Sequence, residues 1–548
     1  MATPELANDY YVANFTVLLD FVDTLYGDIL TAEEEAFSQT FRAVSMDARR
    51  LYVRLMMRKG PHFRDDKLDY PEIGDLLVAA KELEANGLMA VNEELGAVEL
   101  QGLLVRSELE QISKTHLPDI NRSKLDRNSL AATLCDHLPD EIWLKETRSR
   151  FTCLTPAHQQ TLMIYRLLFF GNLMQDLSEF VIVELGLVRY ESYTIGKKDR
   201  LFQSREVLDH LIELLELRSL MYAAEEMGDV ETLIAIGESV PGPFDEARLS
   251  HRRDRILNRT GRYLERYKQF EAALRCYAKA QSPPARERSA RILERLERTR
   301  EALDLCNAIR DQPLDGLEAD FARHFRPKLQ KKLGLPHKKI ARMSHPQVQM
   351  EMTRDLEMNI EQRVIQHLAE EGVTAFHSEN WLWNSLFGLA FWDVVFMPIP
   401  GAFFNAYQRG PKDLYSSEFR RLRERAITLR LEAIREGEFG LADFLRIYEQ
   451  KQGTACHLVA WQALDATLLE AVLERVPAQH MADVFDRFST HPGEFRTGFP
   501  DLFVFGETDY RLMEVKGPGD QLQPNQRRWL RYFSEQGLPY KIARIAWV

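Results

Sequence analysis

Cysteine is scarce in this chain of 548 residues, and no two cysteines form a Cys-x-x-Cys pair. Scattered single cysteines argue against a disulfide framework and against a zinc finger, because both need paired residues at short spacing. We therefore expect free thiols and a reducing compartment. The length suggests roughly three or four domains of ~100–200 residues each. The five cysteines are Cys135, Cys153, Cys276, Cys306 and Cys456.

A secretory leader and a long hydrophobic run are also lacking. The N-terminus carries Glu5 and Asp9 and has no basic region of the kind that opens a signal peptide. The most apolar stretch, residues 386–404, is interrupted by Asp393 and two prolines. A buried helix followed by a loop is favoured there over a membrane span. These patterns predict a soluble, cytoplasmic protein.

The chain has no overall excess of positive charge. Its 71 Lys and Arg residues against 83 Asp and Glu give a net charge of −12, which opposes DNA binding because Lys and Arg neutralise the phosphates. Two local clusters are nevertheless basic. Residues 323–342 hold eight basic residues and no acidic one, and arginines recur at helical spacing over 420–430. Each cluster is either a solvated helix face or a phosphate-binding patch. The candidate nucleic-acid-binding residues are Arg323, Arg326, Lys328, Lys331, Lys332, Lys338, Lys339, Arg342, Arg420, Arg421 and Arg425, with Arg122, Lys124 and Arg127 near the N-terminus.

Two short apolar runs near the C-terminus, residues 501–505 and 510–516, predict a β-hairpin with a four-residue polar turn. Asp501 opens the first strand, while Glu514 and Lys516 lie two residues apart on the second. Alternate residues of a strand point to the same face, so this face gathers two carboxylates and one ammonium group. The arrangement resembles the catalytic hairpin of PD-(D/E)XK nucleases.

Phosphodiester hydrolysis explains why such a set would be useful. A hard divalent cation prefers oxygen ligands, polarises a phosphoryl oxygen and generates hydroxide from water. Asp501 and Glu514 supply carboxylate oxygens, and the main-chain carbonyl of Val515 could supply another. Lys516 is placed to orient the attacking water or to offset charge on the phosphate. The alternative is an ordinary exposed hairpin with a Glu–Lys surface pair, because both motifs are short and common.

The residues after Lys516 favour the nuclease interpretation. A Gly-Pro-Gly-Asp loop follows, then a helix predicted over residues 521–536 and opened by Pro524, and a strand at 540–547. This tail resembles the VRR-nuclease domain, whose pattern is G-x-P-D-L, then E-V-K-G-P-x-D-x-L, then a helical Gln and a W-L pair. The resemblance adds Asp520 and Gln526 as second-tier site residues. The matching residues are Gly498, Pro500, Asp501, Leu502, Glu514, Val515, Lys516, Gly517, Pro518, Asp520, Leu522, Gln526, Trp529 and Leu530.

Residues 1–97 are predicted to form a helical, winged-helix-like region. A helix over 51–59, a short link and a second helix over 73–86 are typical of modules that bind duplex DNA, and also of purely structural modules. Residues 98–144 follow with two short amphipathic helices joined by a basic link. This segment resembles a SAP module, which contacts the DNA backbone.

The middle of the chain, residues 145–360, is almost entirely helix-like and contains a weak internal repeat. Residues 270–277 are echoed about thirty positions later by residues 300–306, with small residues and Leu at matching places. We expect a degenerate, tetratricopeptide-like helical repeat. It could hold the N-terminal modules at a fixed angle to the hairpin, or serve as a protein-interaction platform.

The catalytic domain is predicted to cover residues 361–548, with a long apolar helix over 383–396. PD-(D/E)XK sites commonly add an acidic metal ligand near their first helices, and the resemblance places it at Glu379. The alternative for Glu379 is a helix N-terminal acid stabilised by the helix dipole. Asp393 is expected to pair with an Arg or to cap a backbone group. Histidines that titrate near neutrality are candidate general bases only on that ground, namely His377, His457 and His491.

Over its whole length the chain resembles a bacterial Fanconi-associated nuclease, closely at the C-terminus and more loosely before it. The resemblance implies a mainly α multidomain protein with a C-terminal α/β PD-(D/E)XK domain. It implies a 5′-flap endonuclease and 5′-to-3′ exonuclease acting on branched and cross-linked DNA, associated with the bacterial nucleoid, that releases 5′-phosphate products. One or two Mg²⁺ or Mn²⁺ ions would be held by Glu379, Asp501, Glu514 and Val515. The ubiquitin-binding zinc finger of animal members has no Cys/His set here.

Two other readings remain open at this point. The chain could be a helical-repeat scaffold whose nuclease-like tail binds branched DNA without cutting it. It could also hydrolyse RNA or phosphodiesters generally, because the same metal geometry serves both backbones.

Overall fold

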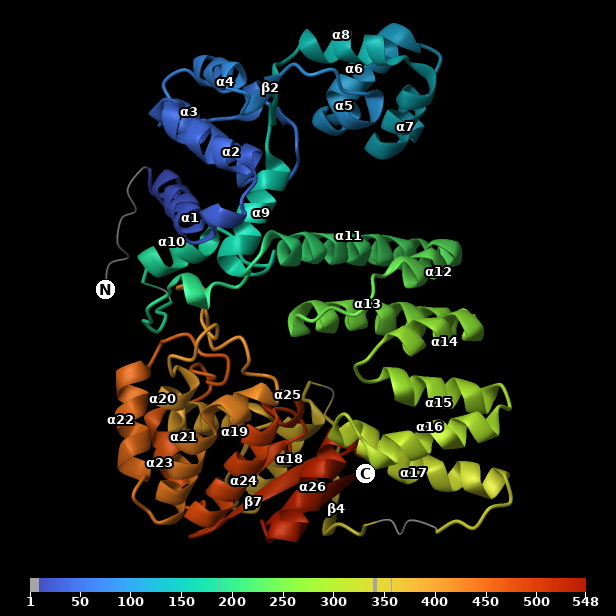
Figure 1. Cartoon of the computed structure of the whole chain (residues 1–548), viewed down its shortest axis with the longest axis vertical. Helices are drawn as coiled ribbons and strands as arrows, with labels where there is room; N and C mark the ends of the chain where they lie inside the picture. Colours follow the sequence, from blue (N-terminus) through green and yellow to red (C-terminus); the bar gives the residue numbers. More distant parts are fainter. Residues whose placement is uncertain (1–8, 187, 339–342, 356) are drawn as a thin grey trace. The chain divides into compact units, whose positions relative to one another are not determined.

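The computed structural model describes residues 9–186, 188–338, 343–355 and 357–548 (Figure 1). The chain divides into two compact units. The first comprises Met1–Leu201, Phe396–Lys412 and Lys451–His457, and the second comprises Phe202–Val395, Asp413–Gln450 and Leu458–Val548. Helices dominate, with an α/β region at the C-terminus, which confirms the predicted fold class. None of the helices in the described part of the chain is long and apolar enough to cross a membrane.

The first unit begins with helices, one of which has an N-terminal capping motif in its sequence. Thr31 and Glu34 form a capping box at the start of α2, each bonding the other's backbone N–H. Phe15 and Phe41 pack with ring centroids 4.8 Å apart beneath these helices. The helices of this unit are α1 (Tyr10–Tyr26), α2 (Ala32–Ala43), α3 (Met46–Met56), α4 (Leu76–Ala85), α5 (Ala97–Leu103), α6 (Arg106–His116), α7 (Arg127–His137), α8 (Asp140–Arg148), α9 (Gln159–Phe170) and α10 (Ser178–Glu184).

A small antiparallel sheet joins distant segments of the first unit. Its strands are β1 (Phe63–Arg64), β2 (Met89–Val91) and β3 (Cys153–Pro156), in the order β1-β3-β2. The SAP-like helices α6 and α7 thus lie in sequence between two strands of one sheet. We expected the helical repeat to start at 145, whereas β3, α9 and α10 belong to the first unit. The strand β3 could not be predicted from the local sequence, because it has only four residues and pairs with the distant β2, where Pro156 lies opposite Met89.

Antiparallel helices stack in succession through the first half of the second unit (Figure 1). Small residues allow their close approach: a Cβ at Gly261 would lie 2.8 Å from the Tyr277 ring, and one at Gly237 would lie 2.5 Å from Cys276 Sγ. The echoed segments fall on α14 and α16, where Cys276 and Cys306 are both buried. The helices are α11 (Arg205–Met227), α12 (Val230–Ser239), α13 (Ala247–Arg266), α14 (Phe270–Lys279), α15 (Ala285–Arg295), α16 (Thr299–Asp311) and α17 (Gly316–Lys332).

The C-terminal region is built on a five-stranded sheet in the order β4-β8-β7-β6-β5. β4 and β7 flank β8 in parallel, whereas β5, β6 and β7 pair antiparallel. The strands are β4 (Gln347–Met352), β5 (Ala375–His377), β6 (Leu502–Phe505), β7 (Tyr510–Lys516) and β8 (Tyr540–Trp547). The helices are α18 (Ile360–Glu370), α19 (Trp381–Ala390), α20 (Trp392–Val395), α21 (Glu418–Arg435), α22 (Leu441–Lys451), α23 (Ala466–Leu473), α24 (Ala478–Thr490), α25 (Pro492–Phe495) and α26 (Pro524–Gln536).

Two features of this region differ from the expectations. The sheet includes β4, so it begins before the predicted boundary at residue 361. The apolar helix expected over 383–396 is two helices, α19 and α20, because the backbone leaves the helical conformation at Phe391. Helix α18 packs Val364 and Leu368 against Met513 and Val515 of β7. The central strand β7 is therefore supported from one face by this apolar cluster.

Candidate active site

Strand register brings the two predicted carboxylates together. β5 pairs His377 with Leu502, and β6 pairs Leu502 with Met513, so Asp501 and Glu514 lie side by side one residue further on. The Asp501 carbonyl accepts hydrogen bonds from the N–H groups of Ser378 (2.8 Å) and Glu379 (3.2 Å). Asp501 Oδ2 accepts a third from the Val515 N–H at 2.7 Å. The end of β5 and the end of β7 therefore fix the position of Asp501.

Glu514 is fully buried next to Asp501, which is 7% exposed. Lys516 Nζ forms an ion pair with Glu514 Oε1 at 2.7 Å. Neither carboxylate oxygen of Glu514 accepts a hydrogen bond from any described residue. Burying a charged group costs free energy unless it is paired and hydrogen-bonded. Glu514 Oε2 therefore leaves room for a further cationic partner.

Both carboxyl groups hold their protons unusually tightly. Burial raises the pKa of Asp501 to about 6, although the Val515 N–H and the Lys516 charge act in the opposite direction. Burial and then the neighbouring Asp501 charge raise the pKa of Glu514 to about 8. The negative charges of Glu379 and Glu361 add to the rise at Asp501. Strongly shifted acids of this kind are typical of functional sites.

Glu379 lies in the short turn between β5 and α19, with a side chain that is 40% exposed. Its Oε1 accepts a hydrogen bond from Asn380 Nδ2 at 3.1 Å. Asn380 has a positive φ of 60°, and its Oδ1 accepts from the N–H groups of Gly498 (2.8 Å) and Phe499 (3.3 Å). One side chain thus ties Glu379 to the segment that leads into Asp501. Sequence reasoning missed Asn380, because its partners lie far along the chain.

The donor atoms around Asp501 and Glu514 are all oxygens, which is the set that a hard divalent cation prefers. Among the described residues, no three His, Cys, Asp or Glu side chains lie close enough together to form a complete metal-binding group. The fit therefore rests on the buried carboxylate pair and the unbonded oxygens of Glu514. Glu361, on the first turn of α18, is a further acidic residue that sequence reasoning did not find; its charge acts on Asp501.

The motif residues around the pair have identifiable structural tasks. A Cβ at Gly498 would lie 2.7 Å from the Asn525 carbonyl carbon, and the positive φ of 93° also favours glycine, so this position lets α26 approach β6. Gln526 Oε1 accepts from the Gln523 N–H at 2.9 Å and caps α26. Asp520 Oδ2 accepts from the Gly517 N–H at 3.0 Å and closes the loop after Lys516. Asp520 and Gln526 thus shape the strand-to-helix connection.

The histidine candidates make other contacts. His377 Nε2 lies 3.8 Å from a Glu379 oxygen, and His491 Nδ1 accepts from the Glu494 N–H at 3.1 Å. His457 belongs to the first unit, while the hairpin belongs to the second. Asp393 pairs with Arg430 at 2.8 Å, as expected, although its side chain is largely exposed.

Several of the predicted basic residues are engaged in local contacts. On α17, Arg326 donates to Asn307 Oδ1 at 2.8 Å and Lys332 pairs with Glu294. Arg323, Lys328 and Lys331 of the same helix are exposed, as is Lys338 in the segment that follows. Lys339 and Arg342 lie outside the described residues.

The other two basic clusters are divided in the same way. Arg420 donates to Asp486 at 2.8 Å, and Arg421 pairs with Glu418, whereas Arg425 is exposed. In the SAP-like segment, Arg122 donates to the Pro118 carbonyl (3.2 Å) and Arg127 to the Gln101 carbonyl (2.7 Å). Lys124 is exposed. Helical spacing alone did not distinguish the exposed side chains from those that tie elements together.

Comparison with known proteins bears directly on this geometry. The VRR-NUC domain profile matches residues 440–547, which carry the hairpin and α26, and the profile described as FAN1, HTH domain matches residues 9–90. A Fanconi-associated nuclease 1 homolog from Pseudomonas aeruginosa is 35% identical, with 98% of this chain and 96% of that protein covered. This chain belongs to the Fanconi-associated nuclease family. It is therefore a DNA nuclease, an enzyme that hydrolyses phosphodiester bonds, and the family implies dependence on a divalent metal.

More distant and structural relatives agree with the family. A Fanconi-associated nuclease 1 homolog from Arabidopsis thaliana is 26% identical over 98% of this chain and 67% of its own length. The crystal structure of paFAN1 bound to 2nt 5′-flap DNA with a gap superposes with a TM-score of 0.92, at 33% identity and with full coverage of both chains. Family membership favours a nuclease over a non-cleaving scaffold.

Proposed function

We propose that this Fanconi-associated nuclease cuts 5′-flap DNA near the junction, degrades strands 5′-to-3′, and acts on branched DNA, including DNA near interstrand cross-links. The observation that carries the cleavage chemistry is the buried Asp501–Glu514 pair, with Lys516 paired to Glu514 Oε1 and with Glu514 Oε2 free of hydrogen bonds from the described residues. The flap substrate is supported by a relative, because paFAN1 has been crystallised with 1nt and 2nt 5′-flap DNAs. Products would carry a 5′-phosphate.

We assign the metal ligands to Asp501, Glu514, Glu379 and the Val515 carbonyl, for one or two Mg²⁺ or Mn²⁺ ions. When bound there, such a cation polarises the phosphate and lowers the pKa of a water. The Val515 N–H keeps Asp501 Oδ2 in place at 2.7 Å, which leaves the other oxygen available. Asn380 holds Glu379 near the pair.

Lys516 provides electrostatic stabilisation in the site. Its Nζ lies beside Glu514, on the same face of β7, and carries a positive charge toward the position where the phosphate would react. A fixed positive charge stabilises the negative charge that develops on the phosphoryl oxygens. The same ammonium group can orient the attacking water. Asp520 and Gln526 keep the loop after Lys516 closed, which preserves its position.

The DNA duplex would be held by exposed basic residues outside the site. Arg323, Lys328, Lys331 and Lys338 form one exposed group in the second unit, and Lys124 lies in the SAP-like segment. Lys and Arg contacts to phosphates give affinity without sequence preference. A structure-specific nuclease needs such contacts, since it selects a junction and not a sequence.

The substrate class can be tested with three end-labelled molecules: a 5′-flap duplex, a matched 3′-flap duplex and a single-stranded RNA. We expect cutting near the 5′-flap junction with Mg²⁺ or Mn²⁺ and none with EDTA. The 3′-flap and the RNA serve as controls for structure and backbone. Equal cutting of all three would contradict the flap assignment, and cutting of RNA alone would move the enzyme to another substrate class.

A further inference from the structure

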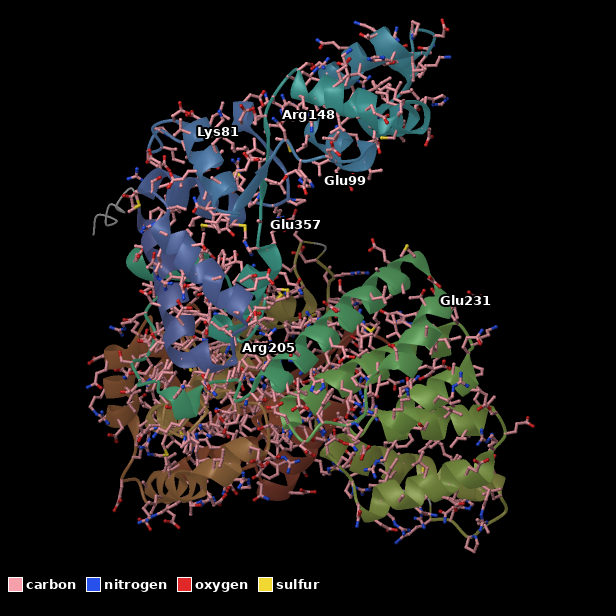
Figure 2. All side chains as sticks on the ribbon, turned by 45° about the horizontal axis from the view of Figure 1, so that its top comes forward. Lys81, Glu99, Arg148, Arg205, Glu231 and Glu357 are labelled. Carbon is pink, nitrogen blue, oxygen red and sulfur yellow. The ribbon has the colours of Figure 1, made fainter. Side chains whose placement is uncertain are left out.

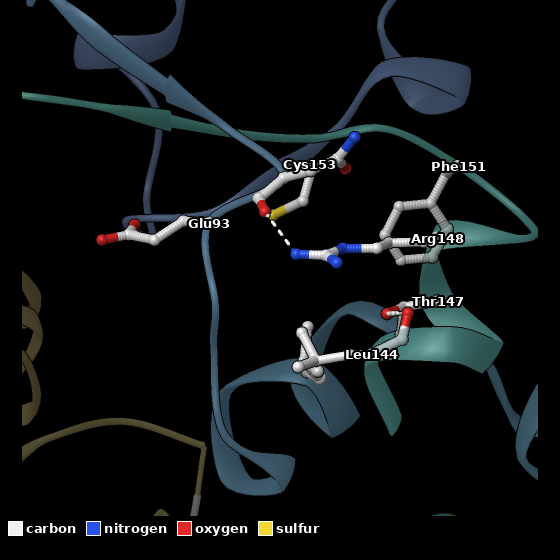
Figure 3. Close-up of a pocket in the computed structure, with 8 residues that line it drawn as sticks. Glu93, Leu144, Thr147, Arg148, Phe151 and Cys153 are labelled. Atoms are coloured by element: carbon white, nitrogen blue, oxygen red, sulfur yellow. Dashed lines mark hydrogen bonds between the residues drawn. The ribbon is translucent and has the colours of Figure 1, made fainter. Parts of the chain in front are cut away.

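A cavity of about 270 Å³ lies between α11 and α13 in the helical repeat. Figure 2 labels Arg205, at the start of α11, and Glu231, on the neighbouring α12. The volume of this cavity is near the lower end of the range for small-molecule sites, roughly 300–1,000 Å³. A second cavity, beside Arg148 and Cys153 in the first unit (Figure 3), measures about 10 Å³ and suits one water at most. The lining residues of the larger cavity are Leu214, Leu215, Arg218, Met221, Tyr222, Arg252, Arg255, Ile256 and Arg259.

The charged residues that line this cavity are all arginines. Arg259 is the one that is paired, because it donates to Glu225 at 3.1 Å and lies over the Tyr222 ring at 4.5 Å. Arg218, Arg252 and Arg255 line the same cavity and make no hydrogen bond or ion pair with any residue that the structure describes; Arg218 and Arg255 are exposed, and Arg252 is half-buried. Three guanidinium groups thus share one cavity without an acidic partner. None of them belongs to the basic clusters that the sequence pattern singled out.

Arg252 is partly buried, and the positive charges of other arginines lie close to it. Burial, and then the charges of Arg248, Arg218 and Arg255, lower the pKa of Arg252 to about 10, with Glu246 acting weakly in the opposite direction. Arginine nevertheless stays protonated at neutral pH, so the fold carries this repulsion as a free-energy cost. An anion in the cavity would relieve it. The buried apolar side chains Leu214 and Ile256 line the cavity beside the half-buried Arg252 and strengthen such an interaction at that arginine.

We propose that the cavity between α11 and α13 binds a phosphate group. The planar donor fork of arginine matches phosphate oxygens in a bidentate manner, and several forks around one cavity suit a tetrahedral anion better than a planar carboxylate. The phosphate comes either from the DNA backbone or from a free phosphate compound. The DNA source rests on the proposed function, whereas a free compound would make the cavity a separate ligand site.

The test compares two double variants of the full-length chain that lose the same charge from the same helix. Arg252→Gln with Arg255→Gln removes two arginines of the cavity. Arg262→Gln with Arg266→Gln removes two exposed arginines of α13 that do not line it. Sodium pyrophosphate is titrated into each protein calorimetrically, in EDTA and at constant ionic strength. We expect the wild type and the α13 control to bind, and the cavity variant to bind at least about tenfold more weakly, the loss of about one charged hydrogen bond.

The second arm measures binding of a 5′-flap DNA by fluorescence anisotropy across a salt series, again in EDTA so that no cutting occurs. Each phosphate contact contributes about 0.9 to the slope of log affinity against log salt. A slope reduced by about one relative to the control would place a DNA phosphate in the cavity. Loss of pyrophosphate binding with an unchanged slope would identify a free phosphate compound. A cavity variant that matches the control in both arms would overturn the proposal.

Further controls distinguish a loss of phosphate binding from a loss of folding or of cleavage. Thermal unfolding without added anion should show the cavity variant to be at least as stable as the control, because mutual repulsion has been removed. Should the double variant fail to fold, Arg252→Lys retains the charge and removes the fork, and it is expected to weaken pyrophosphate binding as well. Asp501→Asn should bind pyrophosphate like the wild type in EDTA. Its loss of cleavage would then report on the hairpin alone.

Discussion

At the scale of single residues, the buried carboxylate pair explains why a cation is needed. Asp501 and Glu514 sit side by side with raised pKa values of about 6 and about 8, and Glu514 has no hydrogen-bond donor among the described residues. The pair therefore binds protons near neutral pH unless a cation replaces them. Lys516 offsets only part of the charge, through one ion pair.

The first prediction concerns stability in the absence of metal. Because the folded pKa values exceed the unfolded ones, the folded chain binds protons that the unfolded chain has released between about pH 4 and about pH 8. In EDTA the free energy of unfolding should fall as pH rises through this window. Urea unfolding across the range measures it, with Glu514→Gln as the comparison. The variant should show a shallower decline, and an equal decline would contradict the assignment of the raised pKa to Glu514.

The sequence predicted the central site residues because their relation is local. Glu514 and Lys516 share a face by strand alternation, and Asp501 is opposite them through a short hairpin. Asn380 could not be found in this way, since it accepts from Gly498 at a separation of 118 residues. Glu361 was also not predicted, because it lies on α18, far from the hairpin in the sequence. Neither residue carries a local signal of its part in the site.

At the scale of elements, α26 packs against the segment that leads into β6. Trp529 of α26 is 1% exposed, and its ring stacks on Phe499 with centroids 4.2 Å apart. Its Nε1 donates to the Phe495 carbonyl at 3.2 Å. Phe499 lies two residues before Asp501, so this packing bears directly on the start of β6.

We expect Trp529→Ala to lower the free energy of unfolding by roughly 3–5 kcal/mol, the cost of removing a buried aromatic side chain. Urea unfolding measures the loss. Leu429→Ala is the control, because Leu429 is 55% exposed on α21, and it should change stability by under about 0.5 kcal/mol. Equal effects of the two substitutions would show that the Trp529 contacts are not a support of the hairpin.

Elements with a local pattern were predicted well, and those defined by distant pairing were not. The strands over 510–516 and 540–547 match β7 and β8, and the helix predicted over 521–536 matches α26 except that α26 begins at Pro524. β4 was missed because its residues are mostly exposed on one face and pair in parallel with β8, at the opposite end of the domain. The helix over 383–396 was predicted as one piece because Phe391 continues its apolar run.

At the scale of the whole molecule, the chain does not follow its linear order of domains. Phe396–Lys412 and Lys451–His457 belong to the first unit, although the surrounding residues belong to the second. A continuous catalytic domain over 361–548 is what the sequence suggested, because no composition change marks these two segments. Their membership depends on contacts such as the Arg189–Thr454 hydrogen bond (2.9 Å), which no local pattern shows.

Exposed lysines of α17 provide a prediction at this scale. Replacing Lys328 and Lys331 with Gln should weaken binding of flapped and unflapped duplexes by a similar factor. The slope of log affinity against log salt should fall by about one to two, as expected for phosphate contacts. Anisotropy titrations in EDTA measure both quantities. Arg300→Gln with Arg310→Gln on α16 removes the same charge and should leave the slope unchanged; matching slopes for both variants would remove α17 from the DNA interface.

The most direct test of the account is single-turnover cleavage of a 5′-flap duplex by Asp501→Asn, with DNA binding measured in parallel. Asparagine keeps an oxygen that can accept from the Val515 N–H, so the fold and the DNA affinity should remain close to those of the wild type. The rate should fall by at least about 100-fold, the scale of losing one group that stabilises developing charge. Cleavage at the wild-type rate, or a loss explained entirely by weaker DNA binding, would contradict the assignment of the active site to the Asp501–Glu514 pair.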